Sequence, residues 1–170
     1  MAAVSQSQAA ILAPVPEHGR FLVLGLRADA DPASSLERLR ALRVDEASVV
    51  GVGRPLVRAG VPGLRPFPGL AGPGCAFPST QGAIFAFFGG VDAGEVLHRA
   101  SAFTTHLGPG FFLQEDVQGF KYAGGRDLSG YEDGTENPEG DSAVRARSSS
   151  GRARASTAGA SSQRSAGRTI

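Results

Sequence analysis

The amino-acid sequence predicts an α+β fold in which an irregular insertion separates two β-α-β units. Two observations carry this prediction. Short apolar runs alternate with segments of helical periodicity, and the helical segments begin with residues that cap helices well. Two split β-α-β units with this spacing indicate a ferredoxin-like antiparallel sheet with two helices on one face. We expect this domain over residues 20–120, after an N-terminal extension of residues 1–19.

The first unit begins with an apolar run, Arg20–Arg27 (RFLVLGLR), which has the length and composition of a buried strand. The next segment is predicted to be a helix, because Asp31 can cap it and Pro32 fits its first position. Three leucines at helical spacing supply its apolar stripe: Leu36, Leu39 and Leu42. The β-branched run at residues 47–52 (ASVVGV) predicts the second strand.

Residues 53–79 are crowded with Gly and Pro and are predicted to form an ordered but irregular loop, with a short helix near residues 56–59. Cys75, the only cysteine, lies in this loop with no histidine nearby in the sequence. We therefore interpret Cys75 as a small buried hydrophobe rather than a reactive thiol. A single cysteine also excludes an internal disulfide and a cysteine-based metal cluster.

The second unit begins with residues 83–88 (AIFAFF), a predicted strand that is apolar on both faces. A helix follows, and Asp92 and Glu95 have the spacing of a capping box at its start. Val91 and Val96 occupy the positions of a hydrophobic staple. The sequence Gly-Pro-Gly at 108–110 ends the helix, and residues 111–120 (FFLQEDVQGF) form the last predicted strand.

The formal net charge of +1 averages two different regions. Residues 141–170 contain six Arg and one Asp, a balance of +5, whereas the first 140 residues carry 11 basic and 15 acidic side chains, a balance of −4. The tail at 141–170 has only Val144 and Ile170 as larger aliphatic residues, so we predict that it is disordered. Its charge allows anion binding, but without aromatic residues for base stacking a nucleic acid is an unfavoured partner.

The N-terminus has neither the basic start nor the apolar core of a signal peptide. No stretch approaches the roughly 20 apolar residues of a membrane span. We therefore expect a cytoplasmic protein without a membrane partner, in a reducing compartment that suits the unpaired Cys75.

Residues 121–140 are predicted to form a loop that contains the stretch Gly130–Pro138 (GYEDGTENP). A carboxylate such as that of Asp133 can move a proton only if it is held near the reacting atom. Glycines on either side of it would let the backbone approach a flat ligand closely. Asp-Gly is also a common turn dipeptide. The residues by themselves therefore leave two alternatives, a surface turn and a loop that holds an acid over a reactive group.

The run GYEDGTENPEG resembles the GxxDG signature region of the DyP-type (dye-decolorizing) haem peroxidases. Four further stretches are similar to the bacterial B-type branch of that family, in the expected order: ILAPVPEHGRFLVLGLR, PGLRPFPGLAGPG, PSTQGAIFAFFGG and EVLHRA. The resemblance covers roughly residues 10–141 and corresponds to the first half of the family's proteins only.

This resemblance implies a haem-dependent peroxidase with haem b as cofactor, and hydrogen peroxide and an organic reductant as its partners. It implies that the haem is held mainly by the second of the family's two ferredoxin-like halves. It further implies that Asp133 is the distal acid/base, which moves a proton between the two oxygens of hydrogen peroxide. The following residues, Gly134, Thr135 and Glu136, would pass along the haem edge, whereas Glu132 is expected to face solvent or form a salt bridge.

The sequence departs from the family pattern downstream of GxxDG, where the family places a proximal haem-ligating histidine and a distal arginine. No histidine follows His106, and the tail arginines match no family context. His18, His98 and His106 match ordinary positions of the first half, so we reject them as ligands and assign no metal ligand. We hypothesise a frameshift or gene-model error near Gly140, because GC-rich coding sequence in a wrong frame tends to give Arg, Ser, Ala and Gly.

Three interpretations follow from the sequence. The first is a DyP-type peroxidase that oxidises organic substrates. The second is a truncated, inactive half-domain without the proximal ligand, which self-associates through the surface that the other half covers. The third is an anion-binding protein that acts through its basic tail. The reducing substrate, packaging in a protein shell and the oligomeric state, a homo-oligomer included, are left open.

Overall fold

The fold is taken from a computed structural model, in which residues 8–57, 61, 64–132 and 137–148 are described. The chain divides into two compact units, Met1–Asp133 and Gly134–Ile170. The first unit contains every strand and two α-helices of the described residues, and the second contains one helix.

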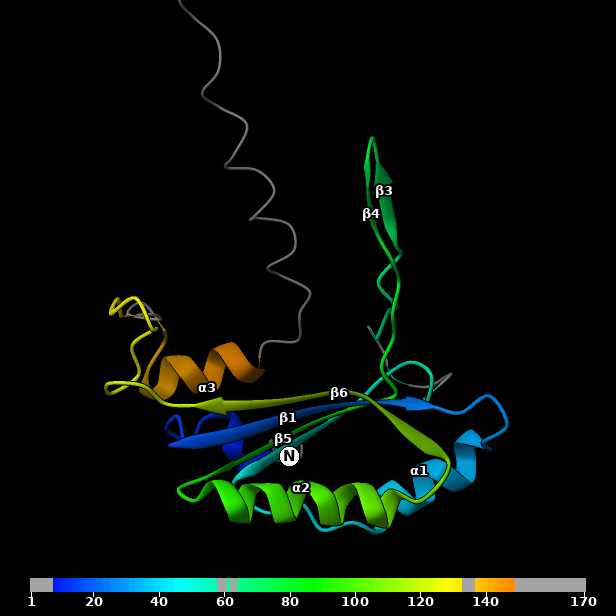
Figure 1. Ribbon diagram of the computed structural model, residues 1–170, viewed down its shortest axis with the longest axis horizontal. Coiled ribbons are helices and arrows are strands. Elements are labelled where there is room, and N and C mark those ends of the chain that lie inside the picture. Colours follow the sequence, from blue (N-terminus) through cyan, green and yellow to red (C-terminus); the bar gives the residue numbers. More distant parts are fainter. Residues whose placement is uncertain (1–7, 58–60, 62–63, 133–136, 149–170) are drawn as a thin grey trace, which may run out of the picture. The chain divides into compact units, whose positions relative to one another are not determined.

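Four strands of the first unit form an antiparallel sheet (Figure 1). The strands are β1 (His18–Leu26), β2 (Ser48–Val52), β5 (Ile84–Gly90) and β6 (Phe111–Phe120). Their order is β2-β5-β1-β6, and each neighbouring pair is antiparallel. With one helix between β1 and β2 and another between β5 and β6, this is the predicted ferredoxin-like α+β arrangement.

Two helices, α1 (Pro32–Ala41) and α2 (Ala93–Leu107), lie on one face of the sheet (Figure 1). Their predicted N-caps are confirmed, because the Asp31 carboxylate accepts hydrogen bonds from two backbone N–H groups of α1. The Asp92 carboxylate accepts one from the backbone N–H of Glu95 at 2.8 Å. The expected staple is wrong, because the side chain of Val91 is 80% exposed.

The hydrophobic core lies between these helices and the sheet. Alternate residues of the central strands enter it, such as Leu22 and Leu24 of β1 and Phe88 of β5. The ring of Phe88 meets that of Phe103 from α2 edge to face, with 5.3 Å between centroids. The predicted leucine stripe of α1 is confirmed, since Leu39 is buried and its two neighbours on the stripe pack against the core.

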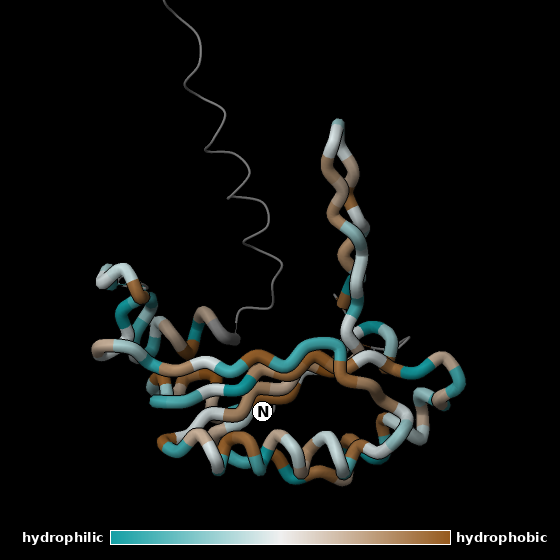
Figure 2. Tube along the Cα trace, in the orientation of Figure 1, coloured by the Kyte–Doolittle hydropathy of each residue, from teal (hydrophilic) through white to brown (hydrophobic). Residues whose placement is uncertain are grey.

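The opposite face of the sheet is also apolar, as the sequence predicted for residues 83–88. Phe21 of β1 lies opposite Phe87 of β5, and their ring centroids are 4.9 Å apart. Phe85 lies next to them, with 6.4 Å between its ring and that of Phe21. The brown stretches along the central strands in Figure 2 show how hydrophobic these segments are. No α-helix of the first unit's described residues covers this face (Figure 1).

The segment before β1 lies along the free edge of β2. The side-chain amide of Gln8 donates to the carbonyl of Val50 at 2.8 Å and accepts from its N–H at 2.7 Å. A short 3-10 helix, η1 (Ala9–Ile11), follows directly. Because unpaired strand edges invite unwanted pairing, this side chain protects β2 where a neighbouring strand would otherwise bind. The sequence alone did not reveal this role for the extension.

Within residues 53–79 the structure has a hairpin that the sequence analysis did not predict. Strands β3 (Leu70–Gly72) and β4 (Cys75–Phe77) form a separate two-stranded sheet. All six strand residues are exposed. The interpretation of Cys75 as a buried hydrophobe is therefore wrong: its strand has no core to pack against. Part of the short helix expected near residues 56–59 lies outside the described residues, and residues 54–56 form a turn.

The second unit contains helix α3 (Gly140–Ser148), where the sequence predicted disorder from residue 141. The structure corrects that expectation for these residues. Ala and Arg have high helix propensity, and Asp141 in the first turn complements the helix dipole. Residues 149–170 lie outside the described part of the chain. Among the described residues, no helix has both the length and the apolar character that crossing a membrane requires.

Candidate functional site

The described chain approaches the GxxDG motif through a compact loop after β6. The backbone N–H groups of Gly125 and Arg126 both donate to the carbonyl of Tyr122, at 2.8 and 3.0 Å. Arg126 also forms isolated β-bridges with Tyr122 and with Glu132. The backbone therefore doubles back on itself before Asp133, although it carries no regular helix or strand.

Asp127 holds the centre of this loop. Its carboxylate accepts hydrogen bonds from the hydroxyl and the backbone N–H of Ser129, at 2.6 and 2.8 Å, and from the N–H of Tyr131 at 3.3 Å. In return, the N–H of Asp127 donates to the carbonyl of Tyr131 at 3.1 Å. The hydrogen bond from the Ser129 hydroxyl is the largest of the effects that lower the pKa of Asp127, because it stabilises the ionised carboxylate.

Glu132, the residue immediately before Asp133, is bound to the same loop. Its carboxylate lies 3.0 Å from the guanidinium of Arg126, which also donates to the carbonyl of Gly130 at 2.9 Å. The expectation that Glu132 faces solvent or a salt bridge is thereby confirmed. Both side chains are about half exposed, so this ion pair orients the loop more than it stabilises the fold.

The four residues that the sequence assigned to the site, Asp133, Gly134, Thr135 and Glu136, lie outside the described residues. The two residues that follow them in the motif, Asn137 and Pro138, are described and exposed. The roles of the four therefore remain predictions. The structure adds the hydrogen-bonded loop that leads to them on the N-terminal side.

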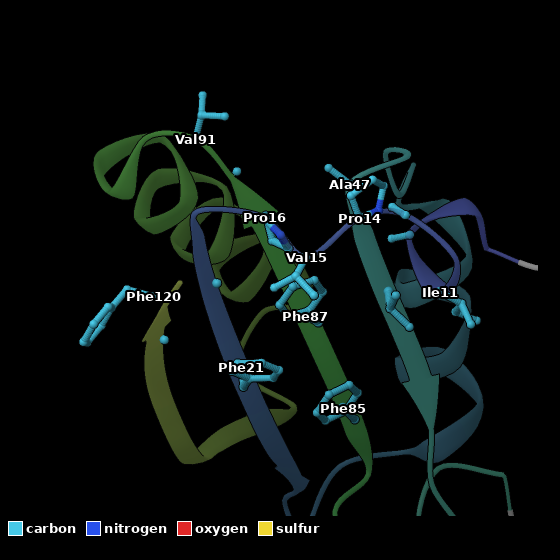
Figure 3. Close-up of a pocket in the computed structure, with 17 residues that line it drawn as sticks. Ile11, Pro14, Val15, Pro16, Phe21, Ala47, Phe85, Phe87, Val91 and Phe120 are labelled. Carbon is cyan, nitrogen blue, oxygen red and sulfur yellow. The ribbon is translucent and has the colours of Figure 1, made fainter. Parts of the chain in front are cut away.

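A separate apolar hollow of about 570 Å³ lies on the open face of the sheet, which is the face opposite α1 and α2 (Figure 3). Its seventeen lining residues are all Ala, Val, Ile, Pro, Gly or Phe, so the described part of the chain presents no polar side chain to it. Phe21, Phe85 and Phe87 line its sheet side, and Val15 and Pro16 come from the segment before β1 (Figure 3).

At the base of this hollow, glycines let neighbouring side chains pack directly against the backbone. A Cβ atom at Gly89 would lie 2.7 Å from Cγ of Pro16, and one at Gly19 would lie 2.9 Å from Cε2 of Phe87. Both separations are too short for carbon atoms, so the aromatic ring and the proline can approach the backbone only because glycine is present. Sequence analysis missed the hollow, although the apolar character of both faces of residues 83–88 was its signal.

The fold therefore defines a ferredoxin-like α+β chain that carries an acidic, glycine-rich loop after its last strand. No protein-family model matches the chain. Two curated dye-decolorizing peroxidases do match it in sequence. The protein of Mycobacterium tuberculosis is 30% identical over 86% of this chain and 48% of its own length. The protein of Rhodococcus erythropolis is 32% identical over 78% of this chain and 44% of its own length.

Solved structures give the same result. DyPB from Rhodococcus jostii RHA1 matches with a TM-score of 0.65 and 27% identity, over 82% of this chain and 50% of that chain. A DypB variant from the same organism, in complex with heme, matches with a TM-score of 0.64 and 28% identity, over 81% and 50%. The chain is thus related in sequence and fold to the DyP-type peroxidases. It spans about half the length of the relatives it matches.

The described residues do not by themselves fit a haem-iron site. His98 and His106 lie exposed on α2, and His18 lies half-buried in β1. None of these three lines the apolar hollow. Within the described ranges, no group of three or more His, Cys, Asp and Glu side chains could hold a metal ion. The rejection of these histidines as iron ligands stays a prediction.

Proposed function

We propose that the chain is the part of a DyP-type haem peroxidase that carries the distal acid/base. The observation that carries this proposal is the combined match in sequence, 30–32% identity, and in fold, with TM-scores of 0.64–0.65, to proteins of that family. The GxxDG motif, Gly130 to Gly134, supplies the candidate residue. The substrates are hydrogen peroxide and an organic reductant.

In this proposal the Asp133 carboxylate takes a proton from one oxygen of hydrogen peroxide and returns it to the other. Its side chain needs a fixed position to do this, because proton transfer works over hydrogen-bond distances only. Gly134, Thr135 and Glu136, which follow it, would line the edge of haem b. The haem, when bound, supplies the redox chemistry.

The described loop supports this role by fixing the chain that precedes Asp133. The hydrogen bonds to Asp127, the ion pair between Arg126 and Glu132 and the hydrogen bond from Arg126 to the carbonyl of Gly130 engage six of the seven residues from 126 to 132. Glu132 is held by Arg126, and we assign the proton transfer to Asp133, the other acid of the GxxDG motif. A positioned acid of this kind contributes about 10²- to 10⁴-fold to a reaction rate.

A second candidate is a half-domain that is inactive by itself. It is favoured by one observation, namely that the chain spans about half the length of the relatives it matches. The two candidates differ in whether this chain alone binds haem.

Haem titration followed by absorption spectroscopy and a peroxide-dependent dye assay tests both. For the peroxidase we expect a ligated Soret band and turnover that Asp133→Asn lowers about 10²- to 10⁴-fold, with haem binding unchanged. Asp29→Asn is the matched control, since this exposed carboxylate lies outside the loop and the GxxDG motif, and its turnover should stay near the unsubstituted value. The absence of a Soret band would favour the inactive half-domain, and full activity in Asp133→Asn would refute the role of that residue.

A further inference from the structure

The loop between β6 and the GxxDG motif is held by polar contacts rather than by the core. All residues from 122 to 132 are exposed, so burial of apolar surface, the main force in folding, contributes little to the shape of this loop. Ala123 has a positive φ of 43°, and it is the one non-glycine residue of the described chain with a positive φ. Such a backbone conformation is strained for alanine and persists only where surrounding contacts hold it.

The hydrogen bonds of Asp127 stay inside the loop. Its carboxylate accepts from Ser129 and Tyr131, and its carbonyl accepts from the N–H of Gly130 at 3.0 Å. These bonds close a turn over residues 127–131. They give the turn a shape but do not orient it, because they reach neither the end of β6 nor Glu132. The orientation of the turn must come from a residue that contacts the chain on both sides of it.

Arg126 makes contacts on both sides. Its backbone N–H donates to the carbonyl of Tyr122 at 3.0 Å, two residues after the end of β6. Its guanidinium donates through Nη1 to the carbonyl of Gly130 at 2.9 Å and through Nη2 to Oε1 of Glu132 at 3.0 Å. Gly130 and Glu132 are the first and third residues of GxxDG. Arg126 therefore connects the start of the motif to the end of the sheet.

These two guanidinium contacts suit arginine and not lysine. A guanidinium presents its donors in a rigid plane and can serve two acceptors at once, whereas the ammonium group of lysine is a point charge on a flexible stem. The acceptor at Gly130 is a neutral carbonyl, so this contact does not need an opposite charge. The side chains of Arg126 and Glu132 are 45% and 62% exposed, so their attraction contributes little to global stability. The effect of Arg126 is therefore local.

We propose that Arg126 is a positioning residue, which fixes the backbone of the GxxDG motif where it leads into Asp133. The inference rests on the proposed function for the role of Asp133, but not for the contacts within residues 126–132. Proton transfer requires that the acid lie within hydrogen-bond reach of the reacting atom. A displacement of about 1 Å can lower a rate by about 10²-fold. Loss of the two guanidinium contacts should therefore lower turnover, although Arg126 transfers no proton.

Backbone NMR relaxation tests the positioning without haem. In Arg126→Ala we expect the order parameters of the N–H groups of Gly130 and Glu132 to fall from about 0.85 to below about 0.6. Arg126→Lys should give the same fall, because lysine cannot serve both acceptors. The matched control is Arg40→Ala, which removes another exposed ion pair, that of Arg40 with Glu37 on α1 at 2.6 Å, and should leave the loop unchanged.

Circular dichroism should show an intact fold in all three variants, since the substituted side chains are exposed. Unchanged order parameters in Arg126→Ala would overturn the inference. Full recovery by Arg126→Lys would also overturn it, because the contact would then depend on charge alone.

Peroxide-dependent turnover shows whether the positioning acts through Asp133. We expect Arg126→Ala to lower kcat about 10- to 10²-fold, with the affinity for haem and the KM for the reductant unchanged. The double variant of Arg126→Ala and Asp133→Asn should be no slower than Asp133→Asn alone, because a positioning residue has no effect once the acid that it positions is absent. Losses that multiply in the double variant would refute the inference. A chain without turnover would count against the proposed function, and the order parameters would then decide the role of Arg126.

Discussion

At the scale of single residues, the loop before GxxDG is organised by one carboxylate, that of Asp127. It accepts hydrogen bonds from two residues that follow it, Ser129 and Tyr131, and so sets the path of the chain toward Asp133. These bonds are strongest while the carboxylate is ionised, because hydrogen bonds to a charged acceptor are shorter and stronger than those to a neutral one. The loop is therefore sensitive to the protonation of this residue.

Acid should loosen this loop only at low pH. The folded-state pKa of Asp127 lies below its ordinary value of 3.8, chiefly because of the Ser129 hydroxyl. A lowered pKa means that the stabilisation is present above pH 3.8 and is lost as the pH falls through the folded-state pKa. We expect the amide proton signal of Ser129 in NMR spectra to titrate with a midpoint below 3.8.

Removal of the hydroxyl in Ser129→Ala should move that midpoint up toward 3.8, and Asp127→Asn should abolish the titration. The Asp133 motif is unaltered in both variants, so they also show how far the loop supports activity. A midpoint above 3.8 in the unsubstituted chain would contradict the assignment of Asp127 as the organising acceptor.

At the scale of secondary structure, local signals in the sequence were sufficient for the helices but not for the hairpin of β3 and β4. Asp31 and Asp92 indicate where α1 and α2 begin, because each capping hydrogen bond joins residues that are only three positions apart in the sequence. The hairpin at residues 67–79 has strands of three residues each and contains three prolines. Such strands are too short to show alternation, and Gly and Pro in the segment favoured an irregular loop.

The cap of α2 should contribute measurably to stability. Replacement of Asp92 by Ala leaves the N–H of Glu95 without its acceptor at 2.8 Å and should lower the free energy of unfolding by about 0.5–2 kcal/mol. Asp92→Ser is the control, because a serine hydroxyl caps a helix about equally well. Urea denaturation followed by circular dichroism measures both, and equal midpoints for Ala and Ser would show that the cap carries no stability.

At the scale of the whole molecule, the sequence predicted the ferredoxin-like sheet because its strands and helices alternate with clear boundaries. It did not predict the hollow, because Phe21, Phe85 and Val15 meet only when β1, β5 and the N-terminal segment pack together. The proposed site residues, from Asp133 to Glu136, came from family resemblance rather than from local physics. Neither glycine spacing nor charge distinguishes a haem-edge loop from a surface turn.

The two apolar faces of the sheet should respond differently to substitution, because only one of them is the folding core. Phe103 on α2 is 6% exposed and packs against Phe88, so Phe103→Ala leaves a cavity that nearby backbone cannot fill. We expect a loss of about 3–5 kcal/mol in the free energy of unfolding. Since domains of this size are stable by only about 5–15 kcal/mol, the urea midpoint should fall sharply. On the face of the sheet opposite α1 and α2, Phe85 is 43% exposed, and Phe85→Ala should cost far less. Equal losses for Phe103→Ala and Phe85→Ala would mean that this face is packed as tightly as the core, against the exposure of Phe85.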